Sequence, residues 1–123
     1  MLPKKFRLCK NADIRTVYRK GRSYAAETVV LHLYRRSAET GNMRFGFVTS
    51  KKIGSAVVRN RIRRRLRETI HSQLNHLKPV QLDIVIVARA AIKDENWSDL
   101  NLTVEKLISR AGMLQMDPIH ENR

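Results

Sequence analysis

The most concentrated chemistry in this sequence is a run of basic side chains between residues 51 and 67. The run contains no acidic residue, and six arginines fall within the nine residues 59–67. Arginine carries a planar group of five hydrogen-bond donors, which can hold a phosphate through two parallel bonds and can stack on bases. Asn60 adds a hydrogen-bonding amide inside the run, whose basic members are Lys51, Lys52, Arg59, Arg61, Arg63, Arg64, Arg65 and Arg67.

This basic run has two interpretations. A charged run is most often a solvated helix face, but such faces usually mix signs at i and i+4, because like charges at that spacing repel each other. The chain as a whole has a formal net charge of +14, and residues 1–67 hold 19 of its 25 Lys and Arg but only 3 of its 11 Asp and Glu. This asymmetry favours binding to a polyanion, and nucleic acid is the commonest polyanion inside a cell.

Catalysis by the protein itself is not indicated. The sequence has no HExxH, paired-cysteine or glycine-rich phosphate motif. His71 and His76 are five residues apart on one expected helix, which places them poorly for a shared metal, while His32 and His120 are isolated. Cys9 has no base partner in view. We therefore predict no catalytic residue and no metal ligand in the protein.

The elements that must position the basic run follow from the spacing of apolar residues. A helix is predicted over residues 11–20, with Asn11 as its N-cap, and a second over about 58–77, where apolar residues recur every fourth position. Runs of β-branched and aliphatic residues predict strands over 28–34 and 43–49. The intervening loop, 37–42, has the length of a hairpin connection, so we expect these two strands to form an antiparallel hairpin.

The C-terminal third completes the expected fold. Residues 82–88 are almost continuously apolar, which is typical of a central, buried strand. A last helix is predicted from an N-cap at Ser98 to a stop at Gly112, and its expected inner face consists of Leu100, Val104, Leu107 and Ile108. The order α-β-β-α-β-α predicts a two-layer α/β sandwich. We expect one domain over residues 1–123, with a frayed tail after about residue 113.

Composition also bounds the cellular setting. No apolar run approaches the roughly 20 residues of a membrane span, and the N-terminal residues lack the apolar stretch of a secretory signal. A single cysteine excludes an internal disulfide framework. The sequence thus predicts an intracellular protein without a membrane partner.

The context of the basic run resembles a known family. Residues 50–68, SKKIGSAVVRNRIRRRLRE, are similar to the signature of the protein subunit of bacterial ribonuclease P. The Arg59-Asn60-Arg61 triplet, with Lys51-Lys52 and Gly54 upstream, is the most specific part. The resemblance extends in order over about residues 7–90 and includes Arg7, Leu8, Asn11, Asp13, Val17, Tyr18, Gly21, Arg44 and Gly46.

The resemblance implies a function. Members of this family pair with a large catalytic RNA, and the complex removes the 5′ leader of precursor tRNA with magnesium held by the RNA. The implied partners are the ribonuclease P RNA and precursor tRNA in the cytoplasm, with no obligate protein partner. The family's signature segment faces the catalytic RNA, which by position assigns RNA contact to Lys51, Lys52, Arg59, Asn60, Arg61, Arg63, Arg64 and Arg67.

The resemblance also implies a fold. The family has a sheet of four strands, one more than the periodicity predicts, and residues 22–26 are available for the extra strand. The implied order is α-β-β-β-α-β-α, an α+β sandwich with a mixed, mostly antiparallel sheet and three helices.

A second family surface is a cleft between the first helix and the sheet, which takes the single-stranded leader. The matching positions here are Ile14, Val17 and Tyr18 on the helix and His32 on a strand. Tyr18 and His32 can stack on bases, which is how proteins usually hold single-stranded RNA. The alternative is that Ile14, Val17 and Tyr18 only pack the helix on the sheet, and one helix face can do both.

The rival class is a plain nucleic-acid-binding module, such as a ribosomal protein or a helical DNA reader. Composition alone does not exclude it. A helix-turn-helix reader would need a second short helix beside the arginine-rich one, where a pair of strands is predicted instead.

Overall fold

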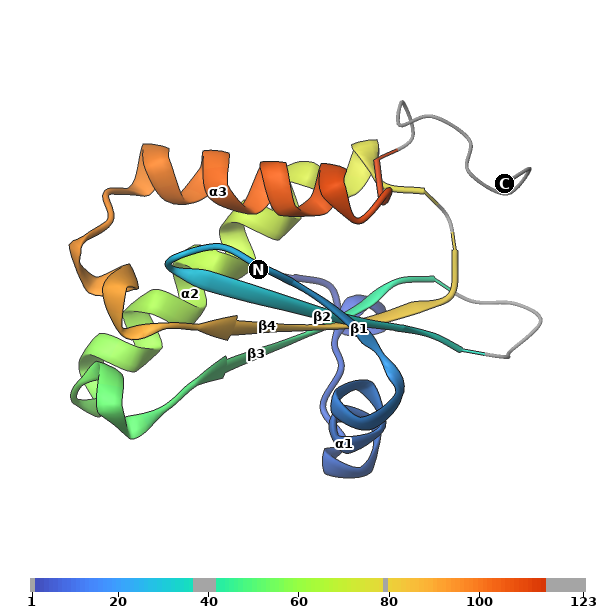
Figure 1. Ribbon diagram of the computed structural model, residues 1–123, viewed down its shortest axis with the longest axis horizontal. Coiled ribbons are helices and arrows are strands. Elements are labelled where there is room, and N and C mark those ends of the chain that lie inside the picture. The colour runs from blue at the N-terminus through green and yellow to red at the C-terminus, as the bar shows by residue number, and fades with distance from the viewer. Residues whose placement is uncertain (1, 37–41, 79, 115–123) are drawn as a thin grey trace.

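The computed structural model describes residues 2–36, 42–78 and 80–114 (Figure 1). The described part has an α+β fold with three helices and a four-stranded mixed sheet. This confirms the predicted class and the order α-β-β-β-α-β-α, including the extra strand within residues 22–26. The helices are α1 (Asn11–Lys20), α2 (Ala56–Gln73) and α3 (Trp97–Arg110), and the strands are β1 (Arg22–Ala25), β2 (Val29–Arg35), β3 (Arg44–Thr49) and β4 (Leu82–Ala88).

The strand order is β1-β2-β4-β3, with β4 antiparallel to β2 and parallel to β3. The expected hairpin between β2 and β3 is therefore wrong, although the two strands do run in opposite directions. The reason lies in β4, whose residues are all buried except for the half-buried Val87. A strand so apolar on both faces is most stable between two neighbours. The connecting loop falls largely on residues 37–41, outside the described residues.

The main hydrophobic core lies between the sheet and the layer formed by α2 and α3 (Figure 1). Strand side chains alternate between the two faces of a sheet, and Ile84 and Ile86 of β4 point to this layer. The predicted apolar stripe of α2 supplies Ile62, Leu66 and Ile70 to the core. The predicted inner face of α3 is confirmed, because Leu100, Val104, Leu107 and Ile108 are all buried.

Helix α1 covers part of the opposite face of the sheet (Figure 1). The two main layers, the sheet and the pair α2 and α3, are therefore joined by a third, partial layer. The fully buried Val17 of α1 packs with Leu8 and with Val85 of β4 in a second, smaller cluster. The turn from α1 into β1 needs Gly21, because a Cβ there would lie 2.4 Å from the carbonyl oxygen of Leu33 and 2.5 Å from that of Val17. Gly21 thereby fixes the close approach of α1 to the sheet.

The helix ends differ slightly from the sequence prediction. The N-cap of α3 is Asn96, whose side chain accepts a hydrogen bond from the Asp99 amide at 2.9 Å, and not Ser98. Asn11 is the first residue of α1 and not its cap. Gly112 does end α3, with a φ of +74° that favours glycine. Within the described ranges, no helix is long and apolar enough to cross a membrane.

Candidate nucleic-acid interface

A glycine turn carries the chain from the two lysines into the arginine-rich helix. Lys51 and Lys52 lie in a short 3-10 turn, η2 (Lys51–Ile53), and both side chains are exposed. Gly54 follows with φ 156° and ψ −160°, a conformation that is essentially restricted to glycine. Ser55 then caps α2 by accepting a hydrogen bond from the Val58 amide at 3.3 Å. The Gly-Ser pair thus places the lysines beside the N-terminus of α2, where the helix dipole also favours an anion.

One flank of α2 carries a row of basic side chains. Arg59, Arg63 and Arg67 are four residues apart and therefore share this flank. The Arg63 guanidinium is held in place, because it donates to Thr49 Oγ1 at 2.7 Å and to the side-chain oxygen of Asn60. Arg59 donates from Nε to the Gly54 carbonyl oxygen at 3.3 Å. Fixed guanidinium groups lose less entropy when they bind phosphate than free ones do.

The basic flank of α2 extends to Arg7, which is not among the predicted RNA-contact residues. Arg63 and Arg67 line a hollow of about 150 Å³ together with Arg7 and Cys9. The hollow forms because Leu8 donates its amide to the Phe45 carbonyl at 2.8 Å, which lays the N-terminal segment along the edge of β3. Arg7 lies far before residues 51–67 in the sequence, so no local pattern signals that it joins the arginines of α2.

The structure does not bring all the predicted residues together. Arg61 lies two positions from Arg59 and Arg63, which on a helix is a rotation of about 200°. It therefore belongs to the opposite flank of α2. Arg65 is on that flank as well, where its guanidinium lies 5.7 Å from the centre of the Trp97 ring. Arg64 is exposed on the solvent side of α2, three residues from Arg67 and therefore beside the flank that carries Arg67.

The second predicted surface contains an aromatic pair on the other face of the sheet. The rings of Tyr18 and His32 meet edge to face, with 5.0 Å between their centres. Tyr18 is 44% exposed, so its ring has free surface for a further stacking partner. Partial burial lowers the pKa of His32, which favours a neutral imidazole at pH 7, and raises the pKa of Tyr18.

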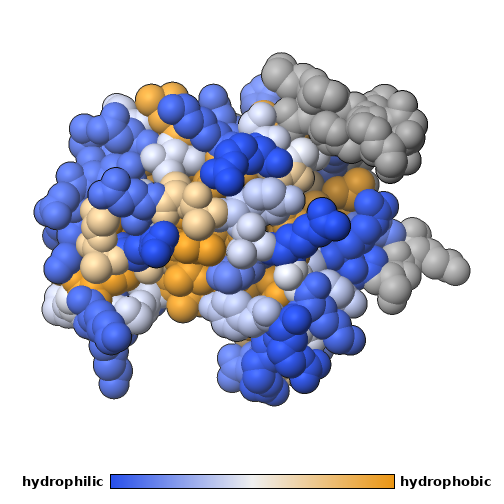
Figure 2. Space-filling view, in the orientation of Figure 1, coloured by the Kyte–Doolittle hydropathy of each residue, from blue (hydrophilic) through white to orange (hydrophobic). Residues whose placement is uncertain are grey.

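The floor beside this pair is apolar. Val30, Val87 and Val48 come from β2, β4 and β3 and lie opposite one another in the sheet register. All three valines are only half-buried. The reason is that α1 covers the neighbouring row of side chains, which includes Val85, and leaves the valine row partly exposed. Figure 2 shows hydrophobic surface in a hollow beside α1. The hydrophilic surface on the other side of this hollow, at the lower left, belongs to the turn before α2, as Figure 1 shows. The three valines were not among the predicted site residues.

The four predicted cleft residues do not share one role. Val17 is completely buried between α1 and the sheet, so it is a core residue that offers no surface to a ligand in this arrangement. Ile14 is half-buried and packs against the same small cluster. Tyr18 and His32 remain accessible in part. Neighbouring positions of α1 thus differ in exposure: Val17 lies in the core, Ile14 is half-buried and Tyr18 is exposed.

A buried carboxylate supports the sheet face on which α1 lies. Asp83 of β4 accepts hydrogen bonds from Arg44 Nε at 2.8 Å and Arg44 Nη2 at 2.7 Å, and it also pairs with Arg36. The hydrogen bond to Asp83 raises the pKa of Arg44 further. Arg44 also lies 3.5 Å from the carboxylate of Asp13 in α1. These ion pairs connect β3, β4 and α1 with Arg36, the residue that follows β2.

The remaining candidates for protein chemistry are scattered. His71, His76 and Cys9 are exposed and lie in separate elements or turns. Among the residues that the structure describes, no group of three or more His, Cys, Asp or Glu side chains could hold a metal ion. These side chains are therefore not gathered into one site within the described residues.

Comparison with known proteins identifies close relatives of the whole chain. The Ribonuclease P family model matches residues 2–112. A ribonuclease P protein component from Symbiobacterium thermophilum is 38% identical over 116 residues, which cover 94% of this chain and 99% of the relative. The structure of the Staphylococcus aureus RNase P protein has a TM-score of 0.82 and 32% identity, covering 91% of this chain and 100% of that one. A Staphylococcus aureus RNase P protein mutant with defective mRNA degradation activity has a TM-score of 0.82 and 33% identity, covering 90% of this chain and 92% of that one.

Proposed function

Because the chain belongs to the ribonuclease P protein family, we propose that it binds the ribonuclease P RNA and the 5′ leader of precursor tRNA. In this role it assists the endonucleolytic removal of the leader, which gives the mature 5′ end of the tRNA. The observation that carries the proposal is the presence of two different RNA-binding chemistries on one small domain. One is a row of fixed guanidinium groups on α2, and the other is an aromatic pair above an apolar floor on the sheet.

The arginine flank of α2 suits the catalytic RNA. A folded RNA presents closely spaced phosphates, and the preordered Arg63, with Arg59 and Arg67 one turn to either side, offers donors at a matching repeat. Lys51 and Lys52 extend the positive surface beyond the helix N-terminus. Arg7 adds a third guanidinium to the hollow lined by Arg63 and Arg67.

The sheet cleft suits the single-stranded leader. Unpaired bases stack on aromatic rings, and the half-exposed valine floor can take the apolar faces of bases next to Tyr18 and His32. A neutral imidazole holds water less strongly than a charged one, so His32 can stack on a base at a lower desolvation cost. The exposed Arg15 and Arg19 of α1 lie on the same helix as Tyr18 and supply charge for the leader backbone.

The chemistry belongs, in this proposal, to the RNA subunit. Magnesium held by the RNA supplies the activation of water, and the protein contributes positioning and positive charge. The protein acts in the cytoplasm with ribonuclease P RNA and precursor tRNA and needs no other protein.

Reconstitution tests this proposal. The purified protein is mixed with ribonuclease P RNA and a precursor tRNA with a labelled 5′ leader, and cleavage is followed as magnesium is varied. We expect the protein to lower the magnesium concentration needed for cleavage, because its charge offsets repulsion between the two RNAs. The proposal fails if the protein binds RNA but leaves the cleavage rate and its magnesium dependence unchanged, as a ribosomal protein would.

The control without RNA subunit is also informative. A mutant of the Staphylococcus aureus RNase P protein is known for a defective mRNA degradation activity. The purified chain is therefore incubated alone with precursor tRNA and with an mRNA. Our proposal expects no specific cleavage of either, and cleavage at the mature tRNA 5′ end by RNA-free protein would contradict it.

A further inference from the structure

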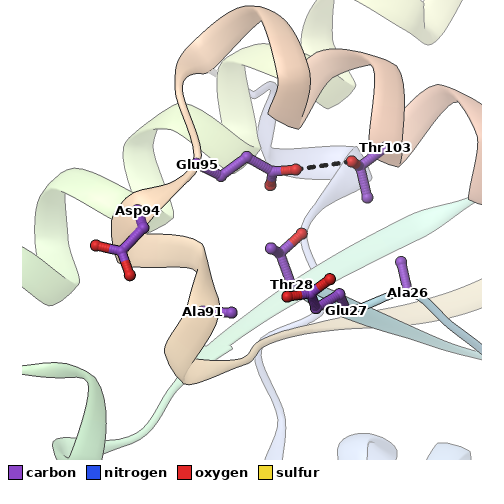
Figure 3. Close-up of a pocket in the computed structure, with 7 residues that line it drawn as sticks. All are labelled: Ala26, Glu27, Thr28, Ala91, Asp94, Glu95 and Thr103. Atoms are coloured by element: carbon purple, nitrogen blue, oxygen red, sulfur yellow. Dashed lines mark hydrogen bonds between the residues drawn. The ribbon is translucent and has the colours of Figure 1, made fainter.

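An acidic pocket lies at the end of the sheet where β1 turns into β2. It has a volume of about 350 Å³ and lies between that turn, the 3-10 turn η4 (Ala90–Asp94) and the first half of α3. Figure 3 shows Glu95 and Thr103 above the cavity and Glu27 and Thr28 below it. The lining residues are Ala26, Glu27, Thr28, Ala91, Asp94, Glu95 and Thr103.

Two buried oxygen atoms in this pocket lack a hydrogen-bond partner. One is Oγ1 of Thr28, a residue that is only 8% exposed. The other is Oε1 of Glu95, whose second carboxylate oxygen accepts a hydrogen bond from Thr103 Oγ1 at 2.9 Å. In Figure 3 the free carboxylate oxygen of Glu95 and the hydroxyl of Thr28 point into the space between them. An unpaired buried polar atom is costly, so this arrangement favours a ligand that donates hydrogen bonds.

The pocket also has the opposite charge to the rest of the protein. Glu27, Asp94 and Glu95 line it, and no Lys, Arg or His does. None of these three carboxylates forms an ion pair with another described residue. The neighbouring Arg89 instead donates to the backbone carbonyl of Ala26 at 2.9 Å. In a chain of net charge +14, such a site attracts the cations that the remaining surface repels.

We propose that this pocket binds the primary ammonium group of a small alkylamine, such as one end of a polyamine. An ammonium group has three donors, which can satisfy Glu95 Oε1 and Thr28 Oγ1 while the charges of Glu27 and Asp94 stabilise it. A directly coordinated divalent metal fits less well, because no described group of three His, Cys, Asp or Glu side chains could hold one. The pocket is built from other residues than the two RNA-binding surfaces, so this proposal does not depend on them.

Titration of the isolated protein with spermidine, followed by amide NMR spectra, tests the proposal without RNA. We expect saturable shifts at Thr28, Glu95 and Thr103. The variant Glu95→Gln should weaken binding about tenfold, since a charge-assisted hydrogen bond is lost. Glu68→Gln is the matched control, because Glu68 is an exposed carboxylate on α2 outside the pocket, and it should bind spermidine as the wild type does. Equal weakening in both variants would mean diffuse attraction and would overturn the site.

Two further comparisons identify the hydrogen bonds. Thr28→Val should fold normally, because it removes an unpaired hydroxyl, but it should bind spermidine several-fold less tightly, whereas Thr28→Ser should keep the affinity. Tetramethylammonium has the charge but no N–H donor, so at equal ionic strength it should not shift these amides. The proposal is wrong if tetramethylammonium binds equally well, if Mg²⁺ binds there and displaces spermidine, or if no amine causes saturable shifts.

Discussion

Asp83 is the residue whose ion pairs contribute most to the stability of the sheet face under α1. Its side chain is 5% exposed and lies between the guanidinium groups of Arg36 and Arg44. We expect Asp83→Asn to lower the free energy of unfolding by about 3 kcal/mol, because two guanidinium groups would lose their shared buried partner. Urea unfolding of wild type and variant measures the difference.

Asp13→Asn is the control for this variant. Asp13 is 34% exposed and lies 3.5 Å from the same Arg44, so its ion pair is screened by water. Its loss should cost less than about 1 kcal/mol. If both variants lose the same stability, burial of Asp83 is not what makes its ion pairs strong.

The pKa of His32 predicts a pH dependence of stability. Burial lowers this pKa in the folded state below its ordinary value of 6.5. As the pH falls below about 6.5, the unfolded chain therefore takes up a proton before the folded chain does, and the free energy of unfolding decreases. Between pH 7.5 and 5.5 the wild type should lose more stability than His32→Phe, which keeps an aromatic ring beside Tyr18. Equal losses would show that other groups cause the decrease.

Single residues also mark the limit of what the sequence predicts. Tyr18 and His32 are predicted to stack on RNA bases, which stays a prediction; the structure shows that their rings contact each other across two elements. The burial of Val17 next to the exposed Tyr18 depends on how α1 is placed on the sheet. Arg7 joins the arginines of α2 because the adjacent Leu8 donates its amide to Phe45 of β3, 37 positions along the chain. Such long-range contacts leave no trace in local spacing.

At the scale of elements, our proposal makes α2 a rigid support for phosphate contacts. Arg64 and Arg67 lie on the side of α2 that is turned away from α3, and their side chains are not buried. Each phosphate contact releases counterions, so Arg64→Ala and Arg67→Ala should each reduce the log–log salt dependence of RNA binding by about one unit. Filter binding to ribonuclease P RNA at several salt concentrations measures this slope.

Lys106→Ala serves as the control for the helix. Lys106 is an exposed basic residue of α3, so the variant removes the same charge from a different layer of the molecule. Its salt slope and its affinity should remain those of the wild type. If the slope changes equally in all three variants, RNA binding follows total charge and α2 is not a specific contact surface.

The elements themselves were largely predictable, whereas their arrangement was not. The apolar periods of α2 and α3 and the continuous run of β4 located these elements and their buried faces. Sequence proximity suggested that β2 and β3 would pair, but the core gains more when the apolar β4 is inserted between them. The predicted N-cap of α3 was Ser98, whereas the observed one is Asn96. Both residue types can cap a helix, so the sequence alone does not distinguish them, and the path of the chain after η4 puts Asn96 in the capping position.

At the scale of the whole molecule, α1 and α2 lie on opposite faces of one sheet (Figure 1). The hollow beside α1 reaches toward the turn before α2 (Figure 2). In our proposal this hollow takes the leader while the arginine flank of α2 contacts the catalytic RNA. Because Tyr18 and Arg64 come from different layers and have no shared partner, substitutions at the two positions should act independently.

The variants Tyr18→Ala and Arg64→Ala therefore make a decisive pair. At saturating protein, Tyr18→Ala should weaken holoenzyme binding to a precursor tRNA with a leader of several nucleotides by about 1–3 kcal/mol, the cost of a lost stacking contact. Binding of mature tRNA, which has no leader, should not change. Arg64→Ala should instead weaken assembly with the catalytic RNA equally for both substrates, and the double variant should show the sum of the two effects.

Tyr18→Phe keeps the stacking face and should keep the affinity for the leader, and thermal unfolding of each variant shows whether the fold is intact. Tyr18 is 44% exposed, so its truncation should leave the core of the domain in place. If Tyr18→Ala weakens the binding of precursor and mature tRNA equally while the fold remains intact, the cleft does not hold the leader. Strong non-additivity in the double variant would mean instead that the two faces are coupled through the sheet, most directly through β4, which contacts α1 and pairs with β3 next to α2.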